Sequence, residues 1–397
     1  MDLGSFYALR EMREGWAAVM LYTTASLGKE DSPTVLRTPL CDLLGIRYPI
    51  FQAPMAGGWT TPALVSEVSD AGGLGMLAGA RVAPDRLQED IRAVKARTDR
   101  PFGVNFLLAR PEEGNRDPIA VQRFLDRFRE ELSLPPGTTE LPPLPPSPLA
   151  EQLKIVFEEG VPVLSTGLGD PTSLVKDAHA AGCRVTAMVT SVEEAILVAE
   201  GGADVVVAQG AEAGGHRSTF EVSPDGEVPL VGTLALVPQV VDAVDVPVVA
   251  AGGIMDGRGL VAALALGARG AQLGTRFLLA RESGAFPAYR ESLLAATETD
   301  TIVTRAFTGR PARGVRNRFV EEYLRSGPEP LAFPFQGMAM EDIYRETQAR
   351  GEGDYFLLLA GQGLRMLKGE QGAAEIVAEL IDGAGEALGV LSPLQRD

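Results

Sequence analysis

The sequence predicts an α/β protein built on a (β/α)₈ barrel, and three observations carry this prediction. Eight short runs rich in β-branched and small apolar residues alternate with stretches whose apolar residues recur at helical spacing. Several helical stretches end in glycine and lead at once into the next strand, which is how a helix turns the chain back toward a barrel. No Gly-x-Gly-x-x-Gly follows the first strand, so the fingerprint of a doubly wound dinucleotide-binding sheet is missing.

The predicted elements follow one another in order from residue 49 onward. We expect strands over residues 49–55, 74–78, 102–107, 161–166, 184–189, 204–209, 246–251 and 271–277. We expect helices between them over residues 61–71, 84–96, 171–181, 192–200, 234–244 and 258–266. In such a barrel the carboxyl ends of all the strands meet at one mouth, where the active site lies.

One insertion interrupts the repeats after the third strand, at residues 118–148. Residues 119–132 have a helical pattern, and residues 134–148 contain seven prolines. Proline has no backbone N–H, so this tract cannot be a helix or a ladder strand and should run extended over the barrel surface. A rigid connector explains the tract better than a partner-binding motif does, because proline content alone is weak evidence for recognition.

The barrel itself is expected at residues 37–285, with a further region after it. After residue 277 the regular alternation stops. A strand-like segment over residues 301–307, a basic stretch over 310–318 and helices from Glu341 onward follow. We expect residues 286–397 to pack on the barrel as a C-terminal helical extension, and a role of this region in forming a homodimer stays open.

Charge and composition limit the partners of the chain. Its 397 residues carry a formal net charge of −17 at pH 7, which argues against a nucleic acid or an anionic membrane as partner. The two cysteines, Cys41 and Cys183, lack metal-ligand spacing, so we expect neither a disulfide nor a metal site. No apolar run reaches the length of a membrane span. Residues 1–36 are expected to be an N-terminal extension and not a secretory signal, so we place the protein in the cytoplasm.

Glycine clusters end the last two predicted strands. Gly252 and Gly253 end the seventh strand, and Gly274 and Thr275 lie late in the eighth. Phosphate groups often bind after these two strands of a barrel, where glycines expose backbone N–H groups to phosphate oxygens. The helix that starts near Asp256 should point its positive end at the same spot. Glycines that merely allow tight turns are the alternative, but two clusters at these strand ends favour a phosphate-bearing cofactor.

A third glycine-rich segment delivers a histidine to the same mouth. His216 follows Gly214 and Gly215, shortly after the sixth predicted strand. Imidazole titrates near neutral pH and commonly takes a proton from carbon or oxygen, so His216 is the candidate general base. Glu212 could orient His216 or pair with the arginine after it, and the sequence leaves both open. The other histidine, His179, lies within a helical stretch and is expected on the surface.

Three further strand ends could line a flat heterocycle. Ala53, Pro54 and Met55 end the first strand, where backbone groups could hydrogen-bond a ring while Met55 packs on it. Asn105 and Gln209 are polar residues at the ends of apolar strands. A buried amide needs hydrogen-bond partners, which can come from a ligand or from the protein itself.

With these residues in place, the chain resembles the nitronate monooxygenase family, formerly called 2-nitropropane dioxygenases. The resemblance extends from about residue 49 to residue 277 and more loosely to residues 361–363. Five segments carry it in the family's order, at residues 52–55, 103–106, 209–217, 251–254 and 272–277. The N-terminal extension and the Pro-rich insertion depart from the compact core of the family.

The resemblance implies a (β/α)₈ flavoprotein that holds FMN at the carboxyl ends of the strands. His216 would be the base near the flavin that assists deprotonation of the nitro compound. The reaction would be the oxidation of an alkyl nitronate with O₂ to a carbonyl compound and nitrite. The residues expected to contact FMN, by resemblance or by membership of a glycine cluster, are Ala53, Pro54, Met55, Asn105, Gln209, Gly214, Gly215, Gly252, Gly253, Gln272, Leu273, Gly274 and Thr275.

Two other functions remain as alternatives. The same superfamily contains FMN-dependent reductases that use NAD(P)H, of the enoyl-ACP reductase and quinone reductase types, with a similar glycine-histidine loop. Gln209 before this loop favours the monooxygenase. A barrel that has lost its chemistry and serves as a scaffold is the third hypothesis, and the presence of His216 together with the glycine clusters counts against it.

Overall fold

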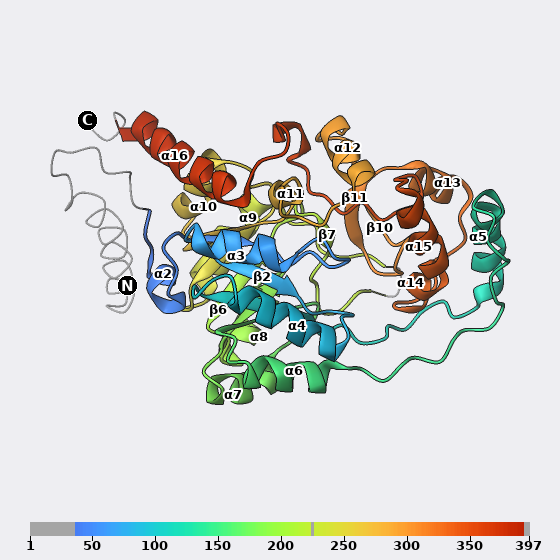
Figure 1. The fold of residues 1–397 in the computed structure, drawn as a ribbon, viewed down its shortest axis with the longest axis horizontal. Helices are drawn as coiled ribbons and strands as arrows, with labels where there is room; N and C mark the ends of the chain where they lie inside the picture. Colours follow the sequence, from blue (N-terminus) through green and yellow to red (C-terminus); the bar gives the residue numbers. More distant parts are fainter. Residues whose placement is uncertain (1–35, 224–225, 393–397) are drawn as a thin grey trace, which may run out of the picture.

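Eight parallel strands form a closed barrel, as the sequence predicted (Figure 1). The computed structural model describes residues 36–223 and 226–392. Within these residues the strand order of the sheet is β1-β9-β8-β6-β5-β4-β3-β2. The strands are β1 (Ile50–Gln52), β2 (Gly75–Ala78), β3 (Phe102–Leu107), β4 (Val163–Gly167), β5 (Arg184–Val189), β6 (Val205–Gln209), β8 (Val248–Ala251) and β9 (Gly270–Leu273).

The barrel closes between β1 and β2. Phe51 and Leu74 form a parallel bridge across the seam. The backbone N–H of Gln52 donates to the carbonyl of Leu74 at 2.9 Å, and the N–H of Leu74 donates to the carbonyl of Ile50 at 2.8 Å. Closure leaves no free sheet edge and gathers all eight carboxyl ends at one mouth.

Helices surround the barrel, and their starts follow sequence signals. Thr61 and Ser191 cap α3 and α8 with their hydroxyl groups, and Pro62 occupies the first turn of α3, where its missing N–H costs nothing. The helices around the strands are α3 (Pro62–Asp70), α4 (Pro84–Lys95), α6 (Leu149–Glu158), α7 (Thr172–Ala180), α8 (Val192–Glu200), α9 (Thr233–Ala243), α10 (Gly257–Ala265) and α16 (Ala373–Leu391).

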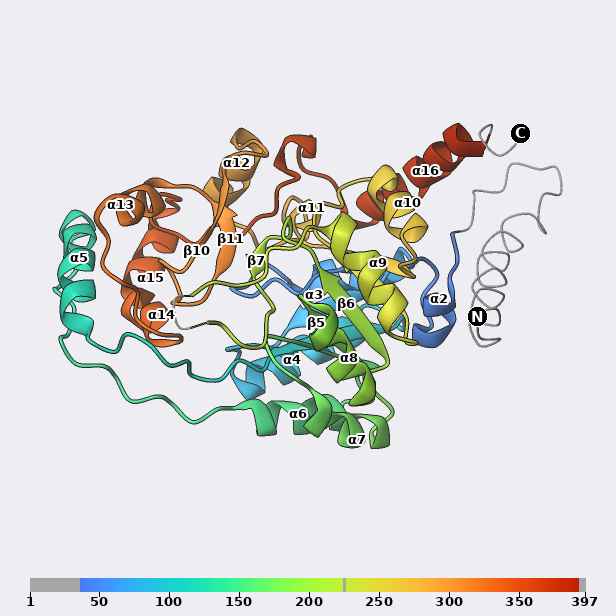
Figure 2. The ribbon, with the colours of Figure 1, turned by 180° about the vertical axis from the view of Figure 1, so that it is seen from behind.

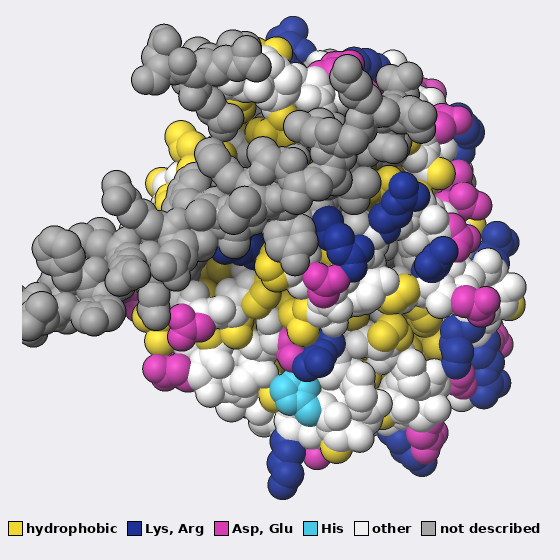
Figure 3. All heavy atoms as spheres, turned by 90° about the vertical axis from the view of Figure 1, so that its left-hand side faces the viewer, with side chains coloured by type: hydrophobic (Ala, Val, Ile, Leu, Met, Phe, Trp, Pro, Cys, Tyr) yellow, Lys and Arg dark blue, Asp and Glu magenta, His cyan; other side chains and the backbone are white. Residues whose placement is uncertain are grey.

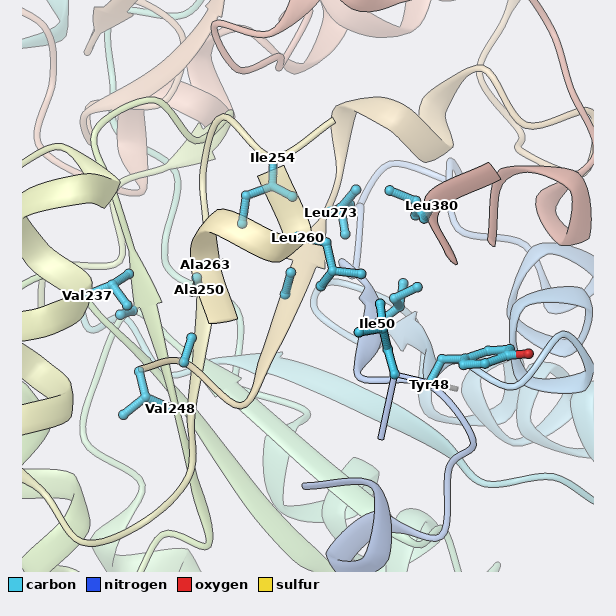
Figure 4. Packing of buried hydrophobic residues seen from close by; sticks show 14 of the residues in the cluster. Tyr48, Ile50, Val237, Val248, Ala250, Ile254, Leu260, Ala263, Leu273 and Leu380 are labelled. Atoms are coloured by element: carbon cyan, nitrogen blue, oxygen red, sulfur yellow. The ribbon is translucent and has the colours of Figure 1, made fainter. Parts of the chain in front are cut away.

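Apolar side chains fill the layer between strands and helices. Figure 4 shows Ala250 of β8, Leu273 of β9, Leu260 of α10 and Leu380 of α16 gathered in one cluster. The short helix α2 (Pro39–Leu44) places its buried apolar side chains, such as Leu40, with the residues that fill the barrel interior. The core therefore supports the strands from outside and from the end that lies away from the mouth.

A second group of elements packs beside the mouth, and we call it the C-terminal lobe. Figure 2 shows α5 lying beside α13 and α15, although far apart from them in sequence. The rings of Phe124 and Tyr323 lie 5.0 Å apart, those of Phe128 and Phe319 lie 5.2 Å apart, and the Arg129 guanidinium pairs with a carboxylate on α15 at 2.8 Å. The lobe consists of α5 (Pro118–Glu131), β10 (Thr301–Thr304), β11 (Ala312–Val315), α13 (Arg318–Ser326), α14 (Phe335–Ala339) and α15 (Glu341–Arg350).

The proline-rich tract leads from this lobe back to the barrel. Residues 134–148 contain neither helix nor strand, as predicted, and most of them are exposed. Figure 1 shows the tract as an extended connection from α5 to α6. The helical pattern before the tract thus belongs to the lobe, and α6, which the sequence analysis did not predict, is the helix that follows it.

Several segments differ from the sequence-based expectations, among them α13 and α14, which were not predicted. The eighth strand ends at Leu273, and the predicted continuation is the short helix α11 (Thr275–Leu278), because periodicity cannot separate helix from strand in so short an apolar run. The basic stretch 310–318 contains the unpredicted strand β11, and α12 (Pro287–Ala295) was also missed. The expected N-terminal extension lies, but for Leu36, outside the described residues.

The surface carries the net negative charge without large patches on the face that Figure 3 shows. On that face acidic and basic side chains are interspersed among apolar and uncharged ones. Among the described residues, no helix is both long and apolar enough to span a membrane.

The buried hydroxyl of Thr186 in β5 gives a prediction about stability. Its Oγ1 has no hydrogen-bond partner, and the side chain is fully buried. Thr186→Val keeps the shape and removes an unsatisfied polar group, so unfolding should require about 1 kcal/mol more free energy. Chemical unfolding measures this change. The matched control is Thr166→Val, which removes a hydroxyl that donates to the carbonyl of Thr186 at 3.2 Å and should destabilise the protein. Equal effects of both changes would contradict the reasoning.

Candidate active site

A single pocket at the barrel mouth brings together every residue that the sequence analysis proposed for the site. It contains about 1240 Å³ of empty space, part of it open to solvent. The predicted residues on its wall are Ala53, Pro54, Met55, Asn105, Gln209, Gly214, Gly215, His216, Gly252, Gly253, Gln272, Leu273, Gly274 and Thr275.

Unpaired backbone donors lie at the ends of β8 and β9. The N–H groups of Gly252, Gly253 and Gly274 have no acceptor among the described residues. Gly252 and Gly253 have φ values of +120° and +71°, which disfavour any residue with a side chain. A Cβ on Gly274 would meet only the Cβ of Ala53, at 3.5 Å, so this glycine borders open space. The donors and the space suit an anionic group.

The helix that follows β8 is capped by an acidic side chain. The Asp256 carboxylate accepts hydrogen bonds from the N–H groups of Arg258 at 3.0 Å and Gly259 at 3.3 Å, at the start of α10. These donors are occupied, and the capping group is itself negative. The expectation that the positive end of α10 points at the phosphate site stays a prediction, and the capped N–H groups of Arg258 and Gly259 are not free to donate to a phosphate.

His216 lies on a strand that joins the barrel to the C-terminal lobe. Gly215 and His216 form β7 (Gly215–His216), which pairs antiparallel with β11 through the partners His216–Ala312 and Gly215–Arg313. The Gln209 amide at the end of β6 donates from Nε2 to the carbonyl of His216 at 2.9 Å. The backbone that carries the imidazole is thus fixed from two sides.

The imidazole of His216 is neutral at physiological pH. Burial, followed by the positive charges of Arg310 and Arg81, lowers its pKa from 6.5 to about 4. Its Nε2 lies 3.0 Å from Oγ1 of Thr308 in the C-terminal lobe. A neutral imidazole has one ring nitrogen that can accept a proton, so the group is in the form that a general base requires.

The carboxylate of Glu212 takes neither of the two roles considered from the sequence. It accepts hydrogen bonds from the backbone N–H of Thr233 at 2.8 Å and from the Thr233 hydroxyl at 2.9 Å, at the start of α9. Arg217 instead donates to the carbonyls of Gly210 and Gln209, at 2.7 and 3.0 Å. Glu212 therefore braces the loop after β6 against α9.

The polar residues on the pocket wall differ in how much of their bonding capacity the protein uses. The Oε1 of Gln209 accepts from the N–H of Ser218 at 2.9 Å, and Nδ2 of Asn105 donates to Ser165 at 3.1 Å. The Oε1 of Gln272 is buried and has no partner. An unpaired buried amide beside an open pocket indicates a ligand that supplies the missing hydrogen bond.

Several pocket residues could not be found by pattern. Trp59 and Tyr289 come from an irregular loop and from α12, with ring centroids 5.6 Å apart, and the Tyr289 hydroxyl donates to the carbonyl of Leu359 at 2.6 Å. Gly361 reaches the pocket because its N–H donates to Oγ1 of Thr275 at 2.9 Å. His179 lies apart from the pocket, 2.8 Å from Asp204, with a partly exposed side chain as expected.

Comparisons with known proteins place this site in a family. A family model described as nitronate monooxygenase matches residues 37–383. A probable nitronate monooxygenase of Staphylococcus saprophyticus is 38% identical over 360 residues, which cover 89% of this chain and 99% of the relative. A probable nitronate monooxygenase of Staphylococcus aureus is 37% identical over 82% of this chain and 92% of its own.

Solved structures agree with this placement. Nitroalkane oxidase from Streptomyces ansochromogenes has a TM-score of 0.81 at 37% identity and covers 89% of this chain and 99% of its own. FabK from Thermotoga maritima has a TM-score of 0.73 at 32% identity, with coverages of 90% and 99%. The chain belongs to the nitronate monooxygenase family, as the resemblance predicted. It is an oxidoreductase whose family implies a flavoprotein that acts on a small molecule.

The lowered pKa of His216 predicts how stability changes with pH. Between pH 6.5 and about 4 the unfolded chain binds a proton at this residue that the folded protein does not bind. Stability should therefore fall as pH decreases through this window, and His216→Asn should remove that component. Chemical unfolding of both flavin-free proteins at pH 7 and pH 5 measures it. The wild type should lose more stability than the variant, and an equal loss would show that His216 titrates normally.

Proposed function

We propose that the pocket binds FMN and catalyses the oxidation of alkyl nitronates with O₂ to carbonyl compounds and nitrite. One observation carries the proposal: unpaired backbone donors, an unpaired amide and a neutral imidazole line the same pocket. In balanced form, two nitronates and one O₂ give two carbonyl compounds and two nitrite ions. The membership of the chain in the family supports this reaction.

The residues present fit the two ends of FMN. The phosphate would be held by the N–H groups of Gly252, Gly253 and Gly274, with the Thr275 hydroxyl beside them. The ring system would take its hydrogen bonds from the unpaired amide of Gln272 and from backbone groups near the end of β1. Bound FMN supplies an electron acceptor that O₂ can reoxidise.

Charges around His216 suit an anionic substrate. Arg310 is almost fully buried, and Arg81 lies next to the pocket-lining Ala80; both act electrostatically on His216. Arg81, together with Arg310, whose charge is partly balanced by the Glu112 carboxylate, would favour a negative nitronate in a pocket whose other walls are largely apolar. A neutral nitroalkane must first lose its α-proton, and His216 is the group that would accept it. Preformed nitronates need no such step.

A reductase that uses NAD(P)H is the second candidate, since FabK shares this fold at 32% identity. The unpaired donors of the pocket would serve FMN in either enzyme. The two candidates therefore differ in the electron donor and not in the cofactor. A homodimer and a cytoplasmic location also stay predictions, and light scattering of the purified protein tests the first.

The role of His216 predicts a selective effect of its removal. His216→Ala should retain flavin and slow the turnover of neutral nitroalkanes by about 10²–10⁴-fold, which is the usual loss when a general base is removed. Preformed nitronates should be oxidised at nearly the wild-type rate. Steady-state oxygen consumption with both substrate forms measures this difference.

His179→Ala provides the control, because it changes the same residue type outside the pocket and should leave both rates unchanged. Unchanged turnover of neutral nitroalkanes in His216→Ala would remove His216 from the mechanism.

The phosphate site predicts that Gly274→Val expels the cofactor. The new side chain would enter open pocket space and meet only Ala53, so the fold should persist while flavin absorbance is lost. Gly252 is less suitable, because a Cβ there would lie 2.8 Å from Oγ1 of Thr233 on strained backbone. Gly389→Val, the same exchange on the open surface of α16, is the control. Full flavin occupancy in Gly274→Val would refute this phosphate site.

An anaerobic absorbance titration separates the two candidate functions. The proposed oxidation predicts that an alkyl nitronate bleaches the flavin and that NADH and NADPH do not. Rapid bleaching of the flavin by NADH or NADPH would contradict the proposed oxidation and favour a reductase. A colourless preparation that binds no added FMN would contradict both.

A further inference from the structure

The imidazole of His216 has one hydrogen-bond partner on the C-terminal lobe, and this partner is fixed in place. Oγ1 of Thr308 lies 3.0 Å from Nε2 of His216. Thr308 lies in the turn between β10 and β11, where Gly309 has a φ of +84°. The buried amide of Gln336 donates to the carbonyl of Ala306 at 2.7 Å and holds the start of this turn.

The residue after the turn is held as firmly. The side chain of Arg310 donates to a carboxylate oxygen of Glu112 and to the backbone carbonyl of Thr219. The exposed fraction of Arg310 is 1%. Its side-chain contacts with Glu112 and Thr219 hold this residue in place. Thr308 is thus presented to His216 by a turn that cannot move without breaking buried polar contacts.

The direction of the hydrogen bonds at the Thr308 hydroxyl determines which nitrogen of His216 carries the proton. Among the described residues, the Thr308 hydroxyl is the one donor to the carbonyl of Arg310, at 3.1 Å. A buried carbonyl without a donor is costly, so the hydroxyl proton belongs to that bond. Oγ1 of Thr308 then acts as an acceptor, both for the N–H of Arg310 at 3.3 Å and for His216. Nε2 of His216 must therefore carry the proton.

We propose that Thr308 is a positioning residue that fixes His216 in the tautomer with a proton on Nε2, which leaves Nδ1 as the base. The kinetic part of this inference rests on the proposed function, in which Nδ1 accepts the α-proton of a neutral nitroalkane. The tautomer itself does not depend on the substrate. The barrel fixes the backbone of His216 through Gln209, and the lobe fixes its ring through Thr308.

The tautomer can be observed directly because the chain contains only two histidines. Protein labelled with ¹⁵N-histidine gives two imidazole spin systems in a long-range ¹H–¹⁵N correlation spectrum, and His179→Gln assigns them. We expect wild-type His216 to show a protonated Nε2 and an unprotonated Nδ1 between pH 6 and pH 8. A protonated Nδ1 in the wild type would overturn the proposal, whatever the substrate proves to be.

Variants of Thr308 test the same assignment through activity. Thr308→Val removes the acceptor of Nε2–H, and we expect the Nδ1-protonated form to become detectable. Turnover of neutral nitroalkanes should fall at least ~10-fold, toward the ~10²–10⁴-fold loss of a missing base, with nitronate turnover retained. Thr308→Ser keeps the hydroxyl and should restore both the spectrum and the rate.

Thr304→Val is the matched control, because it removes a hydroxyl from β10 that accepts a bond from Ala306 and does not contact His216. A wild-type spectrum for His216 in Thr308→Val would overturn the proposal. A spectral change with no loss of turnover would retain the tautomer assignment and contradict the role of His216 as base, so the two failures are distinguishable.

Discussion

The pairing of β7 with β11 is the interaction on which the site depends. The loop after β6 contains three glycines and has little side-chain bulk of its own to hold it. Two residue pairs to β11, and the bond from the N–H of Arg217 to the carbonyl of Pro311 at 2.9 Å, convert this loop into the edge of a sheet. The C-terminal lobe therefore holds the loop that carries His216 at the pocket.

Buried arginine side chains lie near the pocket, although the protein as a whole is negatively charged. The chain has a net charge of −17, yet Arg217, Arg310 and Arg313 are buried behind the histidine loop. Arg217 is held mainly by backbone carbonyls, which solvate a cation without cancelling its charge. Burial is the main cause of the lowered pKa of His216, and Arg310 and Arg81 lower it further.

Local signals were enough to predict the barrel and which strand ends line the pocket. Apolar periodicity is set within ten or so residues, and a parallel barrel brings all strand ends to one mouth, so Asn105 and Gly252 meet without any knowledge of long-range contacts. Thr308 and Tyr289 come from segments without such periodicity, and only the packing of the lobe brings them to the mouth. The role of Glu212 was undecidable for the same reason, since its partner is the distant start of α9.

The barrel and the C-terminal lobe contribute different residues to the pocket. The barrel supplies the glycines and the amide that line the pocket, and these lie at or directly after the ends of its strands. The lobe supplies Thr308, which contacts the imidazole of His216 from a turn held by Gln336 and Arg310. Fold alone does not decide chemistry. FabK from Thermotoga maritima shares this fold at 32% identity, so the barrel by itself does not identify the reaction of this chain. The elements outside the barrel are thus where the specificity of this chain has to be sought.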